Sequence, residues 1–106
     1  MDFSNEPFEV EFTDECIKEL IDIYEYISNN LKEDNIAKKL MTEMLDRVLI
    51  LEDLPELYMK IGKADKLKRE YRRMVVKNYV VLYTVDYEKR TVFIVHIIYG
   101  KRNYLN

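Results

Sequence analysis

Apolar and polar residues alternate along this chain with two different periods. Residues 8–12 alternate apolar with acidic side chains, a period of two that predicts a half-buried strand at a sheet edge. Two longer segments, 14–31 and 35–51, repeat their apolar residues every three or four positions instead. This second period predicts two amphipathic helices.

Local signals set the ends of both helices. Thr13 offers a hydroxyl N-cap to the first helix, while Asp34 caps the second and Pro55 ends it. The first apolar stripe is Ile17, Leu20, Tyr24, Ile27 and Leu31, with Lys18, Glu19, Asp22 and Glu25 expected outside. The second stripe is Ala37, Leu40, Met41, Met44, Leu45, Val48 and Leu51. Because the connection is short, we expect an antiparallel helical hairpin that lies on a sheet.

The last third of the chain predicts that sheet. Three runs rich in β-branched and aromatic residues, 72–77, 79–87 and 91–99, are separated by short polar breaks and predict an antiparallel meander. Residues 57–68 have weak periodicity and are expected to form a connecting loop. The order β-α-α-β-β-β predicts one α+β domain over residues 1–106, with an N-terminal helical hairpin packed on one face of a small twisted antiparallel sheet.

Alternation along the middle strand predicts which side chains the helices cover. The expected core set is Tyr79, Val81, Tyr83 and Val85. The other set is Val80, Leu82 and Thr84, which we expect to join Arg72, Met74 and Val76 on an open face rimmed by Arg72, Arg73, Lys101 and Arg102. An apolar face with a basic rim suits a phosphate-bearing or acidic-peptide partner, and a chain tail or a second copy is the alternative cover.

Charge divides the chain into two unequal parts. Residues 1–59 hold 16 Asp and Glu and 5 Lys and Arg, a net charge of −11, whereas residues 60–106 hold 12 Lys and Arg and 4 Asp and Glu, a net charge of +8. The total of −3 therefore conceals a basic surface able to attract phosphates or an acidic peptide. The alternative is that acidic helices and a basic sheet attract each other across the fold.

The residues that carry catalytic chemistry are few. His96 is the only histidine and Cys16 the only cysteine, so no metal-ligand spacing exists, and we expect neither a metal nor a cofactor. His96 is expected to be a packed, hydrogen-bonded strand residue, and Cys16 to face the apolar side of its helix. No leader or membrane-length apolar run is found, which predicts a cytoplasmic protein without a membrane partner. Tyr99 and Tyr104 flank the Gly-Lys-Arg segment, where they suit contact with a base or ribose.

Three sequence segments together resemble a known family. Residues 71–76 (YRRMVV), 78–83 (NYVVLY) and 97–105 (IIYGKRNYL), in this order of elements, resemble the RelE/ParE superfamily of toxins from bacterial type II toxin–antitoxin modules. The resemblance covers nearly the whole chain. It implies a protein that arrests growth and that a cognate antitoxin wraps and holds inactive. RelE-type members cut messenger RNA in the ribosomal decoding site without a metal, while ParE-type members poison DNA gyrase.

Carried over by position, the resemblance implies roles for particular residues. The implied catalytic residues are Arg72, Arg102 and Tyr104, and the implied substrate-binding or partner-binding residues are Arg73, Lys77, Tyr99 and Lys101. Val80 and Met74 stand where RNA-cleaving members carry basic residues.

We therefore expect a toxin that interferes with translation through ribosome-dependent cleavage of messenger RNA, as a metal-independent endoribonuclease with the ribosome and mRNA as partners. A ParE-type poison of DNA gyrase and a catalytically silent antitoxin-binding module are the alternatives.

Overall fold

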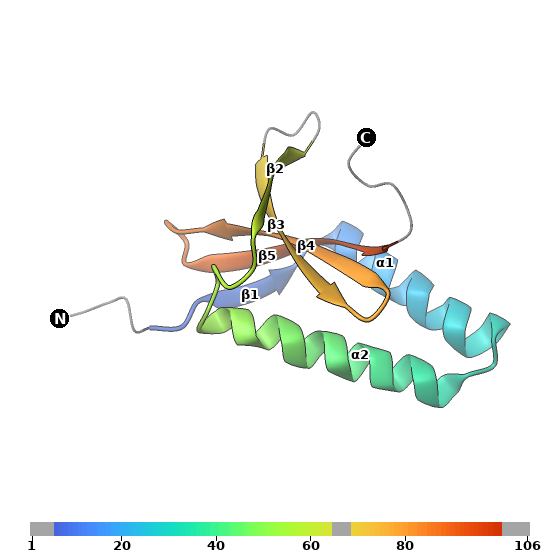
Figure 1. The fold of residues 1–106 in the computed structure, drawn as a ribbon. Coiled ribbons are helices and arrows are strands. Elements are labelled where there is room, and N and C mark those ends of the chain that lie inside the picture. The colour runs from blue at the N-terminus through green and yellow to red at the C-terminus, as the bar shows by residue number, and fades with distance from the viewer. Residues whose placement is uncertain (1–5, 65–68, 101–106) are drawn as a thin grey trace.

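Two helices cover one face of a mixed five-stranded sheet in the computed structural model, which describes residues 6–64 and 69–100 (Figure 1). The elements are β1 (Glu9–Phe12), α1 (Asp14–Glu25), a π-helical turn (Tyr26–Asn30), α2 (Asp34–Leu49), a 3-10 turn (Ile50–Glu52), β2 (Lys60–Ala64), β3 (Arg69–Val76), β4 (Tyr79–Asp86) and β5 (Thr91–Tyr99). The strands lie in the order β1-β5-β4-β3-β2. This arrangement confirms the predicted α+β class and its helical layer.

The sheet departs from the prediction at both of its edges. β1 pairs in parallel with β5, so that Glu9 lies opposite Thr91, whereas all other neighbours are antiparallel. The prediction of a wholly antiparallel sheet was therefore wrong at this pair. The prediction of a loop at residues 57–68 was also wrong in part, because Lys60–Ala64 form β2 beside β3. Together β2 and the first part of β3 rise away from the helices (Figure 1).

The first helix begins as its sequence predicts. The Thr13 hydroxyl accepts a hydrogen bond from the Cys16 N–H at 3.2 Å, which confirms the N-cap. The same hydroxyl donates to the Val95 carbonyl at 3.2 Å, so the cap also fixes the start of α1 to β5. Regular α-helix ends at Glu25, and the π-helical turn carries the chain on to Asn30.

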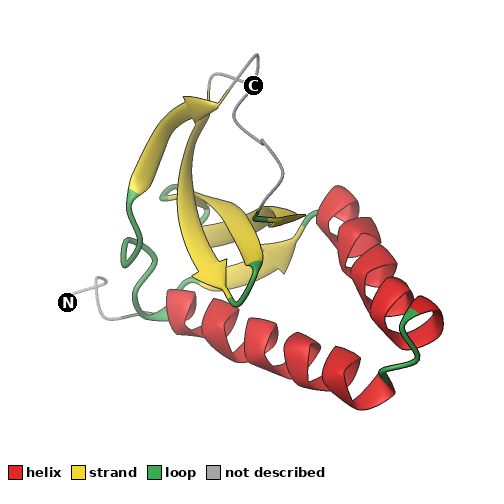
Figure 2. Cartoon of the chain, turned by 45° about the vertical axis from the view of Figure 1, so that its right-hand side comes forward, coloured by secondary structure: helices red, strands yellow, loops and turns green. Residues whose placement is uncertain are grey.

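The second helix begins one residue earlier than predicted. Asp34 is its first helical residue, and Glu33 is the N-cap but makes no capping hydrogen bond through its side chain. The Asp34 carboxylate instead accepts a hydrogen bond from the Ser28 hydroxyl, which closes the turn between the helices. The two helices meet at this turn and diverge toward the sheet, so they form an open V rather than a tightly packed pair (Figure 2). None of the helices in the described part of the chain is long and apolar enough to cross a membrane.

The main core lies between the helices and the sheet. From the helices and the 3-10 turn it takes Cys16, Ile27, Ala37, Leu40, Met44, Val48 and Leu51, and from the sheet Met74, Val76, Val81, Tyr83, Val92, Ile94 and Ile97. Tyr79 and Val85 pack against it, so the predicted core face of the middle strand is confirmed.

The opposite face of the sheet is not open as predicted. Val80 and Leu82 are buried there with Tyr71 and Val95 in a second apolar cluster. Met74 lies opposite Val81 in the register, and therefore on the helix side. The expectation that Arg72, Met74 and Val76 share a face with Val80 and Leu82 was wrong.

Candidate functional site

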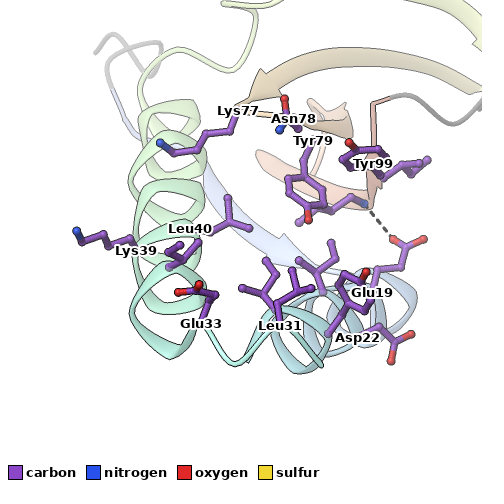
Figure 3. Close-up of a pocket in the computed structure, with 16 residues that line it drawn as sticks. Glu19, Asp22, Leu31, Glu33, Lys39, Leu40, Lys77, Asn78, Tyr79 and Tyr99 are labelled. Carbon is purple, nitrogen blue, oxygen red and sulfur yellow. Dashed lines mark hydrogen bonds between the residues drawn. The ribbon is translucent and has the colours of Figure 1, made fainter. Parts of the chain in front are cut away.

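A groove of about 950 Å³ opens where the two helices diverge from the sheet (Figure 3). The C-terminal part of α1 and the turn after it form one wall, the first turns of α2 form another, and the β3–β4 turn and the end of β5 form the third. The apolar and aromatic side chains that line it are Ile23, Tyr26, Ile27, Leu31, Ile36, Leu40, Tyr79, Ile97, Ile98 and Tyr99. The groove therefore offers a largely apolar surface with few charges.

Five charged side chains border the groove. Glu19 and Asp22 project from α1, while Lys39 projects from α2 and Lys77 from the β3–β4 turn (Figure 3). Lys77 forms an ion pair with Glu43, 3.5 Å between Nζ and Oε1. Glu33, the N-cap of α2, also lines the groove, so the α2 wall carries an acidic as well as a basic side chain.

Glu19 connects α1 to the edge of β5. Its Oε1 accepts the Ile97 N–H at 3.0 Å, and its Oε2 lies 3.1 Å from His96 Nδ1. Glu15, one turn earlier, reaches within 3.9 Å of His96 Nε2. His96 is therefore a packed, hydrogen-bonded strand residue, as predicted. Glu19, which we expected to face outward, is half-buried against the sheet.

Two tyrosines stand at the β5 end of the groove. The rings of Tyr79 and Tyr99 meet edge to face with centroids 5.7 Å apart. Burial, then the neighbouring Tyr99 and Tyr26, raises the pKa of Tyr79 above its ordinary value. Gly100 follows at once, and its N–H donates to the Asn78 carbonyl at 2.7 Å. A Cβ at Gly100 would lie 3.1 Å from that carbonyl oxygen, so this close approach favours glycine.

Arg72 is not on the open face where we predicted it. Its side chain is 13% exposed, and its guanidinium donates to the Tyr58 carbonyl at 2.7 Å and the Glu56 carbonyl at 3.4 Å. The Glu56 carboxylate lies 3.7 Å away. Arg72 therefore holds the segment after α2 against β3. Its catalytic role stays a prediction.

The remaining predicted residues fall into three groups. Lys77 and Tyr99 both line the groove. Arg73 lies opposite Leu82 in the register, and so on the face away from the helices. Lys101, Arg102 and Tyr104 lie outside the described residues. Lys77 and Tyr99 are thus brought to one site, and Arg72 and Arg73 are each directed elsewhere.

The sequence pattern did not reveal the contact of Glu19 with β5, nor that the two helices and the end of β5 together enclose a groove. Glu19 sits on a helix face with other charged residues, a pattern that indicates solvent. No local signal reveals that the strand edge beside it lacks a partner strand. Within residues 6–64 and 69–100, no three His, Cys, Asp or Glu side chains gather in a cluster able to hold a metal.

Comparison with known proteins relates the chain to toxin–antitoxin systems. Residues 10–104 match the family model described as the ParE toxin of the type II toxin–antitoxin system parDE. Among solved structures, the chromosomal ParDE toxin–antitoxin system from P. aeruginosa is similar with a TM-score of 0.68 and 15% identity, covering 87% of this chain and 95% of that one. No curated protein matches the chain in sequence.

Two further structures share the fold. The toxin–antitoxin complex RelBE2 from Mycobacterium tuberculosis is similar with a TM-score of 0.60 and 18% identity, covering 88% of this chain and 98% of that one. The archaeal RelE–RelB complex from Pyrococcus horikoshii is similar with a TM-score of 0.64 and 17% identity, covering 92% of this chain and 99% of that one. At these identities the likeness supports the fold.

Proposed function

Because the chain belongs to the ParE toxin family of type II toxin–antitoxin systems, we propose that it arrests bacterial growth by the ParE-type action, the poisoning of DNA gyrase. The match over residues 10–104 is the observation that carries the proposal. The toxin acts in the cytoplasm, and an antitoxin encoded beside it holds it inactive. The similar folds of three chains from toxin–antitoxin complexes support such a partner.

The chemistry of the described residues supports gyrase poisoning over RNA cleavage. Cleavage through the RNA 2′-hydroxyl needs a base for that proton, a cation for the charged phosphorane and an acid for the leaving oxygen. The Arg72 guanidinium is committed to the carbonyls of Tyr58 and Glu56, and His96 is engaged by Glu19. A poison that acts by binding its target requires no such acid–base set on its own surface.

Message cleavage is the second candidate, and Arg102 and Tyr104 are the residues that favour it. The resemblance to the RNA-cleaving members implies catalytic roles for both residues, which follow the last strand. The net charge of +8 on residues 60–106 also suits a phosphate-rich ribosomal target.

One experiment separates the two mechanisms. The chain is induced in a bacterial host, DNA and protein synthesis are followed by pulse-labelling, and purified gyrase is incubated with plasmid and the protein. We expect DNA synthesis to fall first and gyrase to leave cleaved plasmid. A prompt fall in translation, with codon-phased cuts in a reporter message by primer extension, would establish message cleavage instead.

Growth itself tests the class. Induction of the folded protein should stop colony formation, and co-expression of the antitoxin encoded beside it should restore colonies. Undiminished growth with soluble, folded protein would overturn the toxin proposal in favour of a silent antitoxin-binding module.

A further inference from the structure

Residues 54–59, between the 3-10 turn and β2, have no regular secondary structure, yet local contacts fix their shape. The Leu57 N–H donates to the Leu54 carbonyl at 3.2 Å, which closes a four-residue turn. Pro55 is the second residue of this turn, a position that suits the fixed φ of proline. The turn therefore brings Leu54 and Leu57 close together at its two ends.

The sheet also holds this segment through its backbone. Carbonyls along the segment accept hydrogen bonds from β3 and β4, namely those of Pro55, Glu56, Tyr58 and Met59. The donors are the Tyr83 hydroxyl, the Arg72 guanidinium and the Arg73 N–H. Because these acceptors are used inside the fold, the segment keeps one shape and offers little backbone to an incoming strand.

The apolar side chains of this segment are left exposed. Met59 is 80% exposed, and Leu54 and Leu57 are each 51% exposed. Tyr87, which is more than half exposed, joins them because its hydroxyl donates to the Glu56 carboxylate. Apolar side chains that gather on the surface, with polar groups around them, are typical of a site that binds another protein.

Charged side chains next to these apolar residues are already paired. The Glu56 carboxylate lies 3.7 Å from the Arg72 guanidinium. Lys60 follows Met59 directly, and its Nζ lies 3.0 Å from Glu70 Oε2. A partner that covers the apolar residues therefore does not leave these charges without a counter-ion.

Shape and position indicate which kind of partner fits. Residues 54–59 come after the last turn of α2, whereas the groove lies at its first turns, so the two surfaces are at opposite ends of that helix (Figure 2). A symmetric pair of copies uses one self-complementary surface, which would require an apolar pocket beside the turn. An extended peptide binds in grooves or along strand edges. Exposed side chains on a fixed turn instead suit an apolar pocket in a folded protein.

We propose that residues 54–59 contact gyrase, with Leu54, Leu57 and Met59 inserted into an apolar pocket of that protein. The proposal rests on the proposed function, because it takes gyrase as the target. A segment that is already fixed in one shape loses little conformational entropy when it binds. The hydrogen bonds from β3 and β4 then hold the surface that gyrase recognises.

Leu57 and Ile21 allow a matched pair of substitutions. Both are 51% exposed, but Ile21 lies on α1, where it lines a separate cleft with Tyr24 and Met41. Leu57→Asp and Ile21→Asp therefore make a similar chemical change on two surfaces. Urea unfolding of both variants establishes that they are folded.

The first test measures the concentration of purified chain that gives half-maximal plasmid cleavage by gyrase. We expect Leu57→Asp and Met59→Asp to raise this concentration by about 10-fold or more, because each places a charge in an apolar interface. Ile21→Asp should stay within about threefold of the wild type. Wild-type activity in both folded variants of residues 54–59 would overturn the inference while leaving gyrase as the target.

Oxidation of Met59 tests the contact on the wild type, without a substitution. Peroxide converts an accessible methionine to its sulfoxide, and mass spectrometry locates the product. We expect gyrase with plasmid to slow the oxidation of Met59 by about fivefold or more, and to leave the half-buried Met41 unchanged as the reference.

The other outcomes of this footprint are equally decisive. Undiminished oxidation of Met59 in a stable complex with gyrase would overturn the inference. Protection of Met59 by the antitoxin, with none by gyrase, would also overturn it and assign residues 54–59 to the antitoxin. A wild-type chain without effect on gyrase would refute the proposed function itself, and this inference with it.

Discussion

At the scale of the residue, Arg72 matches a functional residue of the family in sequence, but its side chain makes structural hydrogen bonds within the fold. Its guanidinium reaches two backbone carbonyls of the segment after α2, which has no regular structure of its own at Glu56 and Tyr58. Arg47 reaches the same region from α2, donating to the Tyr58 hydroxyl and to the Val75 carbonyl, each at 3.1 Å. Two arginines thus join α2, this segment and β3.

Removing the Arg72 clamp should lower stability. We expect Arg72→Ala to reduce the free energy of unfolding by about 1 to 3 kcal/mol, because a largely buried charged donor to two carbonyls is lost. Arg72→Lys should recover only part of the loss, since an ammonium lacks the fork that reaches both oxygens. Urea unfolding measures the effect, with the exposed Lys38→Ala as control. A stable Arg72→Ala that loses toxicity would show that Arg72 acts directly in function.

The raised pKa of the Cys16 thiol makes the free energy of unfolding depend on pH in the alkaline range. Burial, with a smaller contribution from Glu19, raises the pKa of the Cys16 thiol from 9.0 to about 12. The unfolded thiol therefore ionises first, and the stability present below pH 9 is lost as the pH rises toward about 12. Burial also raises the pKa of Tyr83, from 10.0 to about 12, so that residue contributes only at higher pH.

The interval between pH 9 and 10 therefore isolates the thiol. Over this interval the wild type should lose about 1 kcal/mol more of its free energy of unfolding than Cys16→Ala does. Urea unfolding at pH 8, 9 and 10 measures both proteins. Parallel losses in the two proteins would show that the folded thiol ionises near its ordinary pKa.

At the scale of the element, α1 substitutes for a strand along part of β5. Thr13, the N-cap of α1, and Glu19, within its first half, satisfy backbone groups that a longer β1 would have paired. We expect Glu19→Ala to lower the free energy of unfolding by about 1 to 2 kcal/mol, because the Ile97 N–H loses its acceptor. Glu19→Gln keeps an oxygen for that N–H and should cost less.

Glu25 on the same helix provides the comparison for Glu19. Its side chain is exposed, so Glu25→Ala should change the free energy of unfolding by no more than about 0.5 kcal/mol. Equal effects of Glu19→Ala and Glu25→Ala in urea unfolding would mean that α1 is held by its apolar contacts alone.

The error in the register of β3 comes from one residue in a turn. The predicted strands 72–77 and 79–87 leave only Asn78 between them, which would place even-numbered residues of both strands on one face. The turn instead contains Lys77 and Asn78, with Lys77 at a φ of 53°, so Val76 lies opposite Tyr79. A slip of one residue moves every side chain of a strand to the other face. Arg72 was misplaced for this reason.

The pairing of the two edge strands, β1 and β2, could not be predicted from the local sequence pattern. β1 was predicted from its alternation, but its parallel pairing with β5 joins segments about 80 residues apart and leaves no local mark. β2 contains Lys60, Gly62 and Lys63, a composition that is poor for strands, and it forms because β3 provides an edge. The helices and the three meander strands, by contrast, carry their own periodicity and were predictable.

At the scale of the whole molecule, some of the opposite charges of the two parts of the sequence pair with each other inside the fold. The acidic part, residues 1–59, supplies Glu43 and Glu56 to Lys77 and Arg72 of the basic part, residues 60–106. These pairs support mutual attraction between the helical layer and the sheet, and they leave a smaller basic surface for partners than the count suggests. Among the basic candidates, Arg73 lies on the face of the sheet away from the helices, and Lys101 and Arg102 lie outside the described residues.

Toxic action and antitoxin capture should therefore separate by mutation. Ile36→Asp places a charge in the groove, and if the antitoxin docks there this variant should arrest growth and resist rescue by the co-expressed antitoxin. Arg102 lies outside the described residues, and if it contacts the cellular target, Arg102→Ala should permit growth while still copurifying with the antitoxin. Colony counts with and without the antitoxin, together with affinity capture of each variant, measure both properties. Joint loss of the two properties in both folded variants would indicate that the antitoxin and the target share one surface, whereas joint retention would show that neither residue belongs to either surface.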